Sequence, residues 1–360
     1  MKQKFKNMSD TNLLLTITIV VFFAMYIGAI IFQGAGFLKP QTFFNMLIAN
    51  SALIITSCGM SLVMITGGID ISVGGVVALV SMSCAVLLDY KGGNVLEALL
   101  LAIGIGLAFG LVQGYLVAYL NIQPFIVTLA GMFFARGMTT IVHTNPFNVE
   151  NEAFVALKDT RITIPGLGSV NKLGVYVPAY VNIGVIVALA IVIILFIVLK
   201  WTKYGRHFYA VGGNRQSALM LGINVKRTVF VSHLVCGLLA GIGGFVYFLY
   251  VGSGSASHAS GMEMNAIASS IIGGTMLTGG VGNIIGTLFG VLSLSTIQNI
   301  VSSAGLDQAW WTGITIAAML CIFLVVQSVV MARKKKAEYW KKAEAAFLKG
   351  MQPLLKDIKI

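Results

Sequence analysis

The chain has 360 residues, of which 57% are hydrophobic and only 10% are charged, and its mean hydropathy is +0.90. A soluble domain carries about 25% charged residues, so this composition excludes one and indicates a polytopic membrane protein. The net charge of +12 does not indicate nucleic-acid binding, because the basic residues cluster beside apolar runs, at 2–6, 200–227 and 333–359. Such clusters report membrane topology, since positive residues are retained on the cytoplasmic side.

Apolar runs of about 20 residues predict ten transmembrane helices. They lie near 12–32, 43–65, 72–90, 95–120, 123–142, 181–200, 228–250, 263–278, 283–302 and 308–331. An even number of crossings places both lysine-rich termini on one side, which the charge bias identifies as the cytoplasm. We expect an all-α protein with a cytoplasmic N-terminal segment (1–11), a transmembrane domain (12–331) and a basic cytoplasmic tail (332–360). The transmembrane domain would carry an external loop (143–180) and a cytoplasmic loop (201–227).

The stretch MITGGIDISVGG, residues 64–75, places a carboxylate between the second and third apolar runs. A charged residue at the centre of a bilayer costs about 2.5 to 3.5 kcal/mol on insertion scales. Gly67 and Gly68 supply flexible backbone, while Asp70 or Ser72 can cap the next helix by accepting hydrogen bonds from its first amide groups. The pattern predicts either a broken helix that borders a polar cavity, as in transporters, or a capped turn near the cytoplasmic face.

Two ladders of glycines have four-residue spacing, one in each half of the chain. This spacing aligns the glycines on one helix face and lets a neighbouring backbone approach closely, so we predict helix packing rather than ligand contact. Their recurrence also suggests an internal duplication, which is common among transporters. The ladders are Gly106, Gly110 and Gly114 in GLAFGLVQG, and Gly282, Gly286 and Gly290 in GNIIGTLFG.

The segment 201–227, WTKYGRHFYAVGGNRQSALMLGINVKR, is predicted to project into the cytoplasm. Asn214 is an expected helix N-cap, RQSALML forms two turns, and Gly222 stops the helix. We favour a docking element for a cytoplasmic partner over a basic loop that touches anionic lipid. The docking residues would be Asn214, Arg215, Ala218, Leu219, Leu221 and Gly222.

Several motifs are absent from the sequence. There is no GxxxxGK[ST] phosphate loop to hold ATP, and neither HExxH nor GxSxG indicates an intramembrane enzyme or a metal site. Asp70, Arg136 and Glu263 are the ionisable groups near or within the spans, too few for a proton relay. If the chain is a transporter, its energy comes from another subunit. An ion-coupled secondary sugar transporter is the alternative.

Three stretches resemble, in order, the signature regions of the ribose-type sugar permeases of bacterial ABC importers. They are TGGIDISVGG, AVGGNRQSALMLGINV and NAIASSIIGGTMLTGGVGNIIGTLFG. The resemblance extends from about residue 12 to 331. Within that family, FIVTLAGMFFARGM, ITIPGLG and WWT look most like a galactofuranose-importer permease, one of two permeases that such systems pair as a heterodimer.

The resemblance implies a permease subunit of a bacterial inner-membrane importer that works by alternating access. It would pair with a second permease, identical or paralogous, and receive a monosaccharide from an extracytoplasmic binding protein. A cytoplasmic ABC ATPase would hold ATP and Mg, with no cofactor in this chain, and would grip segment 206–224.

A pathway for a neutral sugar should present amide, hydroxyl and aromatic side chains. Each polar candidate has an alternative role in an interhelical hydrogen bond, worth about 0.6 kcal/mol on average. Glu263 and Asn265 are expected to cap the eighth span or to meet the binding protein, and Arg136 has no partner assignable from sequence. The pathway candidates are Asn45, Asn50, Ser51, Gln113, Thr128, Phe133, Phe134, Gln298, Asn299, Trp310 and Trp311.

Overall fold

The computed structural model describes residues 10–170, 174–305, 310–329 and 332, so most of the predicted N-terminal segment and basic tail lie outside the described residues. Each predicted span contains a helix. Within the described residues, eight helices are long and apolar enough to cross a membrane. They are α2 (Asp10–Gln33), α3 (Pro40–Ile65), α5 (Val95–Ala118), α6 (Pro124–Val142), α8 (Ile183–Trp201), α11 (Val225–Val251), α13 (Ile284–Ser303) and a C-terminal helix (Trp310–Val329).

Two of the predicted spans form shorter helices. The helix α4 (Val73–Asp89) has 17 residues and α12 (Met262–Ile272) has 11. At 1.5 Å per residue, α12 covers about 17 Å, roughly half of the hydrocarbon core of a bilayer. We expected a helix as far as residue 278, but it ends at Ile272 because Gly274 adopts a positive φ of 89° that does not continue a right-handed helix.

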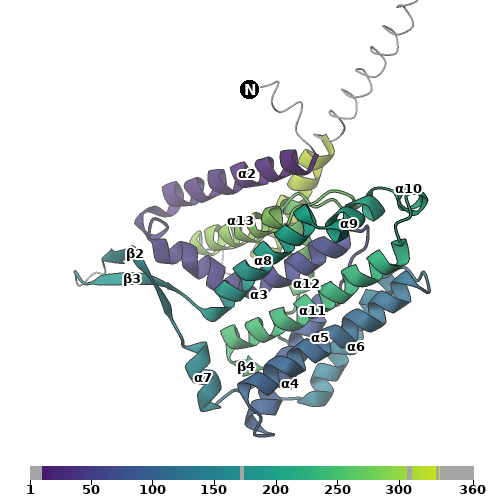
Figure 1. Cartoon of the computed structure of the whole chain (residues 1–360). Helices are drawn as coiled ribbons and strands as arrows, with labels where there is room; N and C mark the ends of the chain where they lie inside the picture. Colours follow the sequence, from purple (N-terminus) through teal and green to yellow (C-terminus); the bar gives the residue numbers. More distant parts are fainter. Residues whose placement is uncertain (1–9, 171–173, 306–309, 330–331, 333–360) are drawn as a thin grey trace, which may run out of the picture.

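The helix α3 lies at the centre of the bundle (Figure 1). In its most apolar stretch, 83% of the residues are buried. Ile54, Ile55 and Met60 are 1% exposed or less, so α3 is surrounded rather than buried along a single stripe. It packs against α8, α11, α12 and α13.

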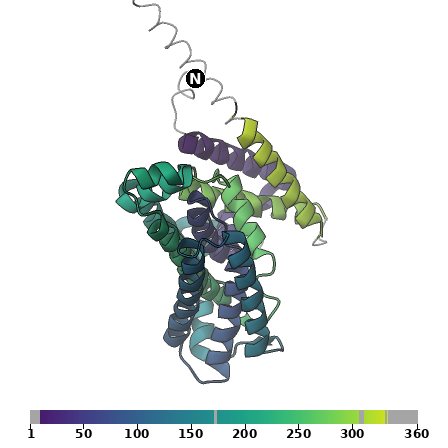
Figure 2. The same ribbon diagram turned by 90° about the vertical axis from the view of Figure 1, so that its right-hand side faces the viewer.

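The half-length helix α12 ends inside the bundle, where its last carbonyl groups need partners. Thr18 of α2 donates a hydrogen bond to the carbonyl of Ile272 at 2.8 Å, and Gln327 of the C-terminal helix donates to that of Ile271 at 2.6 Å. Figure 2 shows α2 and the C-terminal helix on the same flank of the molecule. These two peripheral helices therefore complete the hydrogen bonding of an interrupted one.

The two ends of the bundle differ in structure (Figure 1). One end carries the short helices α9 (Lys203–Gly213) and α10 (Arg215–Met220), and we call it the α9–α10 end. The opposite end carries α7 (Glu152–Lys158) and an antiparallel hairpin of β2 (Ile162–Val170) and β3 (Tyr176–Val181). There β1 (Phe147–Asn148) also pairs with β4 (Ser253–Gly254). The sequence predicted a loop over 143–180 but not this hairpin.

The first glycine ladder lies between α5 and α11. A Cβ atom on Gly106 would overlap the carbonyl oxygen of Gly237, and one on Gly110 would lie 3.0 Å from the carbonyl oxygen of His233. Gly114 contacts the next turn of α11, at Phe230. The two backbones approach so closely that a side chain at Gly106 would separate them.

The second ladder lies against the end of α12. Gly286 and Gly290 face the backbone of Gly273 and Ser269, again with no room for a Cβ atom. Gly282, which we expected on the same helix, instead precedes α13, because the N-cap is Asn283. It lies in the loop between α12 and α13.

Candidate coupling site at one end of the bundle

The helix α10 begins and ends where the sequence predicts. The side chain of Asn214 accepts a hydrogen bond from the amide of Ser217 at 2.8 Å, which makes it the N-cap. Gly222 follows the helix with a φ of 78°, and its amide donates to the carbonyl of Leu219. The N-cap and the terminating glycine both depend only on neighbouring residues, so the sequence is enough to predict the two ends of this helix.

An apolar tip is exposed at the end of α10. Leu219, Met220 and Leu221 are 63%, 77% and 78% exposed. Arg215 is exposed at the start of the same helix. Ala218, which we expected to share this surface, is instead 1% exposed and packs inside the chain among residues of α5, α6, α9 and α11. The surface open to a partner is therefore the residues 219–221 with Arg215.

The helix α9, which the sequence did not predict, joins this tip to the bundle. Its N-cap is Thr202, and Asn214 ends it by donating its backbone amide to the carbonyl of Ala210. Because Asn214 also caps α10, the two short helices share one residue at their junction.

Gly212 of α9 lies between two loops of the membrane domain. The amide of Gly280 donates a hydrogen bond to the carbonyl of Ile65 at 2.9 Å. A Cβ atom on Gly212 would overlap that carbonyl oxygen and would lie 2.5 Å from the amide nitrogen of Gly280. The neighbouring Gly213 has nothing within 4 Å of its Cβ position. We call this contact of Gly212, Ile65 and Gly280 the glycine junction.

Tyr209 adds a second contact, three residues before Gly212. Its hydroxyl donates to the carbonyl of Gly282 at 2.8 Å. Burial raises the pKa of Tyr209 to about 12, so the hydroxyl stays protonated and remains a donor at neutral pH.

The same tripeptide, Thr-Gly-Gly, forms both loops at the junction, at 66–68 after α3 and at 278–280 before α13. Gly67 and Gly279 have φ values of 83° and 84°, and a Cβ atom on Gly279 would lie 3.0 Å from the Cα of Gly67. The helix α9 therefore contacts both the loop after α3 and the loop before α13. This repeated tripeptide and the Gly-Gly pair in AVGG were the sequence signals that could have located the junction.

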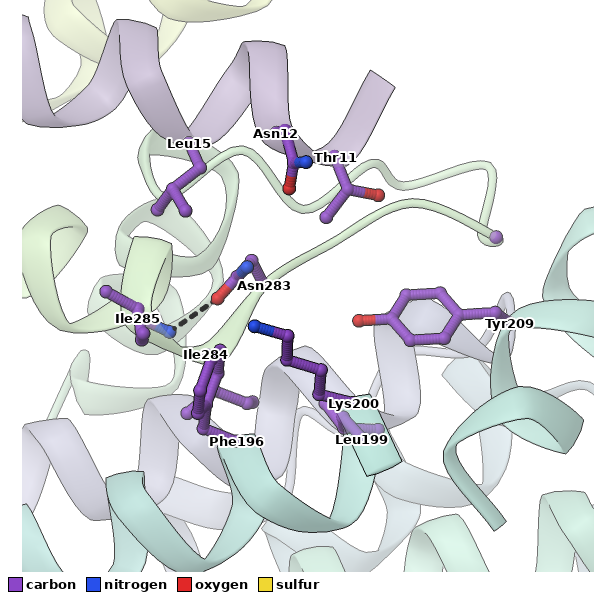
Figure 3. A pocket seen from close by; sticks show the side chains of 11 residues that line it. Thr11, Asn12, Leu15, Phe196, Leu199, Lys200, Tyr209, Asn283, Ile284 and Ile285 are labelled. Atoms are coloured by element: carbon purple, nitrogen blue, oxygen red, sulfur yellow. Dashed lines mark hydrogen bonds between the residues drawn. The ribbon is translucent and has the colours of Figure 1, made fainter. Parts of the chain in front are cut away.

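A cavity of about 450 Å³ lies beside α9 (Figure 3). It is bounded by α2, α8, α9 and the start of α13 with the loop before it, and the side chains of Lys200, Tyr209 and Asn283 point toward it. Asn283 is not free there, because its side chain accepts a hydrogen bond from the amide of Ile285 at 2.8 Å.

Asp70 is 1% exposed, in the loop between α3 and α4. Its Oδ1 accepts hydrogen bonds from the amide and the hydroxyl of Ser72 at 3.0 and 2.6 Å. Ser72 is the N-cap of α4, but its side chain makes no capping bond. The buried carboxylate of Asp70 therefore fixes the loop before α4 through these two hydrogen bonds. The backbone amide of Gly68 donates to the carbonyl of Val63 in the last turns of α3.

The predicted pathway residues fall into separate groups within the chain. Asn50 joins α3 to Ser295 of α13 at 2.9 Å, and Asn299 bonds to the carbonyl of the same serine. Gln113 and Thr128 lie instead near the loop between α3 and α4, where they meet the hydroxyl of Ser72 and the carbonyl of Ile69. Asn45 accepts from Gln41 within α3, Gln298 is half-buried on α13, and Phe133 is exposed on α6.

One pair was missed by sequence reasoning. Arg136 of α6 and Glu263 of α12 approach to 3.9 Å. Glu263 and Asn265 do not cap α12, whose N-cap is Gly261 without a side-chain bond. Nothing local predicts this pairing, since the two residues are far apart in sequence.

Comparison with known proteins identifies relatives of this chain. The chain is 37% identical over 320 residues to the inner membrane ABC transporter permease protein YjfF of Escherichia coli, covering 89% of this chain and 93% of that protein. It is 34% identical over 326 residues to the fructose import permease protein FruG of Bifidobacterium longum, covering 90% and 93%. It is 34% identical over 289 residues to the ribose import permease protein RbsC of Escherichia coli, covering 80% and 86%. No solved structure matches it.

Residues 42–324 match one family along most of the chain. This range runs from the start of α3 into the C-terminal helix and includes α9, α10 and both loops of the glycine junction. The chain belongs to the membrane permease family described as the branched-chain amino acid transport system / permease component.

Proposed function

We propose that the chain is the membrane-spanning subunit of an ATP-driven importer that moves a monosaccharide by alternating access. The family description names branched-chain amino acids, whereas three of the similar proteins are named as import permeases for fructose, ribose, and galactose or methyl galactoside. Their extensive coverage of this chain supports a sugar over an amino acid. Among sugars, the resemblance of FIVTLAGMFFARGM and ITIPGLG favours galactofuranose.

The coupling role is supported by a chain of contacts from the exposed apolar tip of α10 to the loop after α3 and the loop before α13. Leu219, Met220 and Leu221 stand exposed on α10, and α10 continues into α9, whose Gly212 fits between the loops after α3 and before α13. A partner that moves the tip therefore moves both loops. Alternating access requires two packings that differ by a few kcal/mol, and a motor shifts their populations by binding one of them better.

The basic residues around α9 and α10 support a cytoplasmic position for that end, by the positive-inside rule. Both termini then lie in the cytoplasm, and the hairpin β2–β3 faces the opposite side, where a sugar-binding protein delivers its cargo. ATP and Mg belong to the ATPase. A second permease, identical or paralogous, completes the pathway between two such chains. The lysine-rich tail, 332–360, would contact the membrane surface or the ATPase.

The importer is tested by reconstituting the chain with its ATPase, second permease and binding protein, and measuring uptake of D-galactose, D-ribose and D-fructose. Uptake should require ATP and every component. Uptake by the chain alone in a proton or sodium gradient, without nucleotide, would instead establish the ion-coupled alternative.

The coupling role is tested by the double variant Arg215→Glu with Leu219→Asp. It should insert normally but lose ATPase attachment and stimulated ATP hydrolysis, because a charged tip no longer offers an apolar contact. Leu38→Asp is the control, since Leu38 is 65% exposed and precedes α3 at the opposite end. Normal stimulated hydrolysis in the double variant would refute docking at α10.

A further inference from the structure

An ion pair lies within the membrane domain, between α6 and the start of α12. Arg136 donates hydrogen bonds to the carbonyls of His258 and Ala259 at 2.5 and 2.8 Å, and its guanidinium lies 3.9 Å from the carboxylate of Glu263. It thereby fastens the segment that leads into α12. It is the one salt bridge that the structure shows among the described residues.

The pair lies well inside the bundle. Arg136 precedes the end of α6 by six residues, or about 9 Å along the helix axis. A Cβ atom on Gly74 would overlap a carboxylate oxygen of Glu263. Gly74 precedes Asp89, the last residue of α4, by 15 residues, or about 22 Å. These two distances place the charges between the ends of two helices of the membrane domain, rather than at an end of the bundle.

The two charges differ in exposure, because Glu263 is buried with its Oε2 enclosed, whereas Arg136 is partly open. The side chain of Arg136 is 23% exposed and that of Glu263 is 11% exposed. Asp70, unlike Arg136, is enclosed. A charge within a membrane-spanning segment is costly against lipid and is found facing a bundle interior or a water-filled cavity. The face of α6 that carries Arg136 therefore borders water or protein rather than lipid tails.

That face has the composition of a sugar-binding surface. Phe133, Arg136, Gly137 and Thr140 follow the i, i+3, i+4, i+7 spacing that places residues on one side of a helix. Phe133 is 65% exposed, and Gly137 and Thr140 are also exposed. An aromatic ring, a guanidinium with spare donors and a hydroxyl match the apolar faces and hydroxyl groups of a monosaccharide.

We propose that this face of α6, residues 133–140, lines the sugar pathway and that Arg136 donates hydrogen bonds to the hydroxyl groups of the passing sugar. The inference rests on the proposed import function and adds a location and a contact to it. The carbonyls of His258 and Ala259 and the nearby carboxylate of Glu263 hold the guanidinium in place, and two hydrogen bonds use only part of its five N–H donors.

A matched pair of cysteine variants tests where the pathway lies. Phe133 and Phe134 are adjacent on α6, about 1.5 Å apart along the helix axis. They are 65% and 62% exposed, but Phe134 points toward α5, where its ring lies 6.1 Å from that of Phe109. In the full complex with Cys321→Ala, a membrane-impermeant methanethiosulfonate reagent should label Phe133→Cys at least about tenfold faster than Phe134→Cys. Equal rates, or no labelling at either position, would refute the pathway assignment.

The role of Arg136 needs variants that separate sugar contact from folding. Arg136→Gln alone leaves Glu263 without its partner, whereas Arg136→Gln with Glu263→Gln removes both charges and tests the contact without that penalty. We expect the double variant to insert normally, to assemble with the ATPase, and to transport D-galactose, D-ribose or D-fructose at least about tenfold more slowly. Transport restored to the wild-type rate would show that the pair is structural.

The two failures are distinguishable. If the unmodified complex imports no sugar, the proposed function fails before any variant is made. If it imports sugar and Phe133→Cys stays unlabelled, the import function stands and the location of the pathway is wrong.

Discussion

Gly212 in α9 lies directly against the carbonyl oxygen of Ile65, the last residue of α3, with no space for a side chain between them. The same carbonyl accepts the amide of Gly280 from the loop before α13. The carbonyl oxygen of Ile65, at the end of α3, thus contacts both α9 and the loop before α13. The predictions below follow from contacts of this kind.

Gly212→Ala should reduce transport and the sugar-stimulated rate of ATP hydrolysis by at least about tenfold. The added methyl group forces α9 away from Ile65 and Gly280, and overpacking of this kind costs about 1–3 kcal/mol. The measurement is stimulated hydrolysis in the reconstituted complex. Gly213→Ala is the matched control, because nothing lies within 4 Å of its Cβ position. If the two variants hydrolyse ATP at equal stimulated rates, the glycine junction does not couple the ATPase to the membrane domain.

Tyr209→Phe should destabilise the chain by about 0.5–1.5 kcal/mol, because one hydrogen bond to the carbonyl of Gly282 is lost. The pKa of Tyr209 is raised above its usual value of 10, to about 12, so its contribution is full below pH 10 and disappears as the pH rises toward 12. Thermal unfolding in detergent should therefore show the same difference between wild type and Tyr209→Phe at pH 7 and pH 9. A difference that shrinks over this range would mean that the hydroxyl ionises early.

Gly106→Ala should lower the stability of the chain by about 1–3 kcal/mol, since the methyl group would overlap the backbone of α11 at Gly237. Gly104→Ala lies one half-turn away with open space around it, and should be neutral or stabilising by about 0.5–1 kcal/mol through helix propensity. Unfolding midpoints of the two purified variants provide the comparison. If Gly106→Ala is as stable as Gly104→Ala, the close contact of α5 and α11 is wrong.

Asp70→Asn should preserve insertion and most of the stability, because an amide oxygen can still accept from the amide and hydroxyl of Ser72. Asp70→Ala should cost about 1–3 kcal/mol, since those buried donors lose their acceptor. Detergent-solubilised yield and unfolding temperature distinguish the two variants. Normal insertion of Asp70→Asn together with complete loss of transport would assign the negative charge itself a role.

The sequence alone determined the features that depend on neighbouring residues. Apolar length placed a helix in each predicted span, and cap chemistry set both ends of α10 at Asn214 and Gly222. These features are decided within a few turns of chain, where hydrophobic length and local hydrogen bonding act directly. The residues of the signature stretches were likewise enough to indicate the family.

Only the tertiary structure decided which of these elements meet. The half-length helix α12 is possible because Thr18 and Gln327, distant in sequence, complete its last hydrogen bonds. Ala218 is buried because neighbouring helices enclose it. Arg136 and Glu263, 127 positions apart in sequence, lie close together because α6 and the start of α12 are brought together by the fold. Contacts between distant segments depend on the packing of the whole bundle, and no local pattern of residues records it.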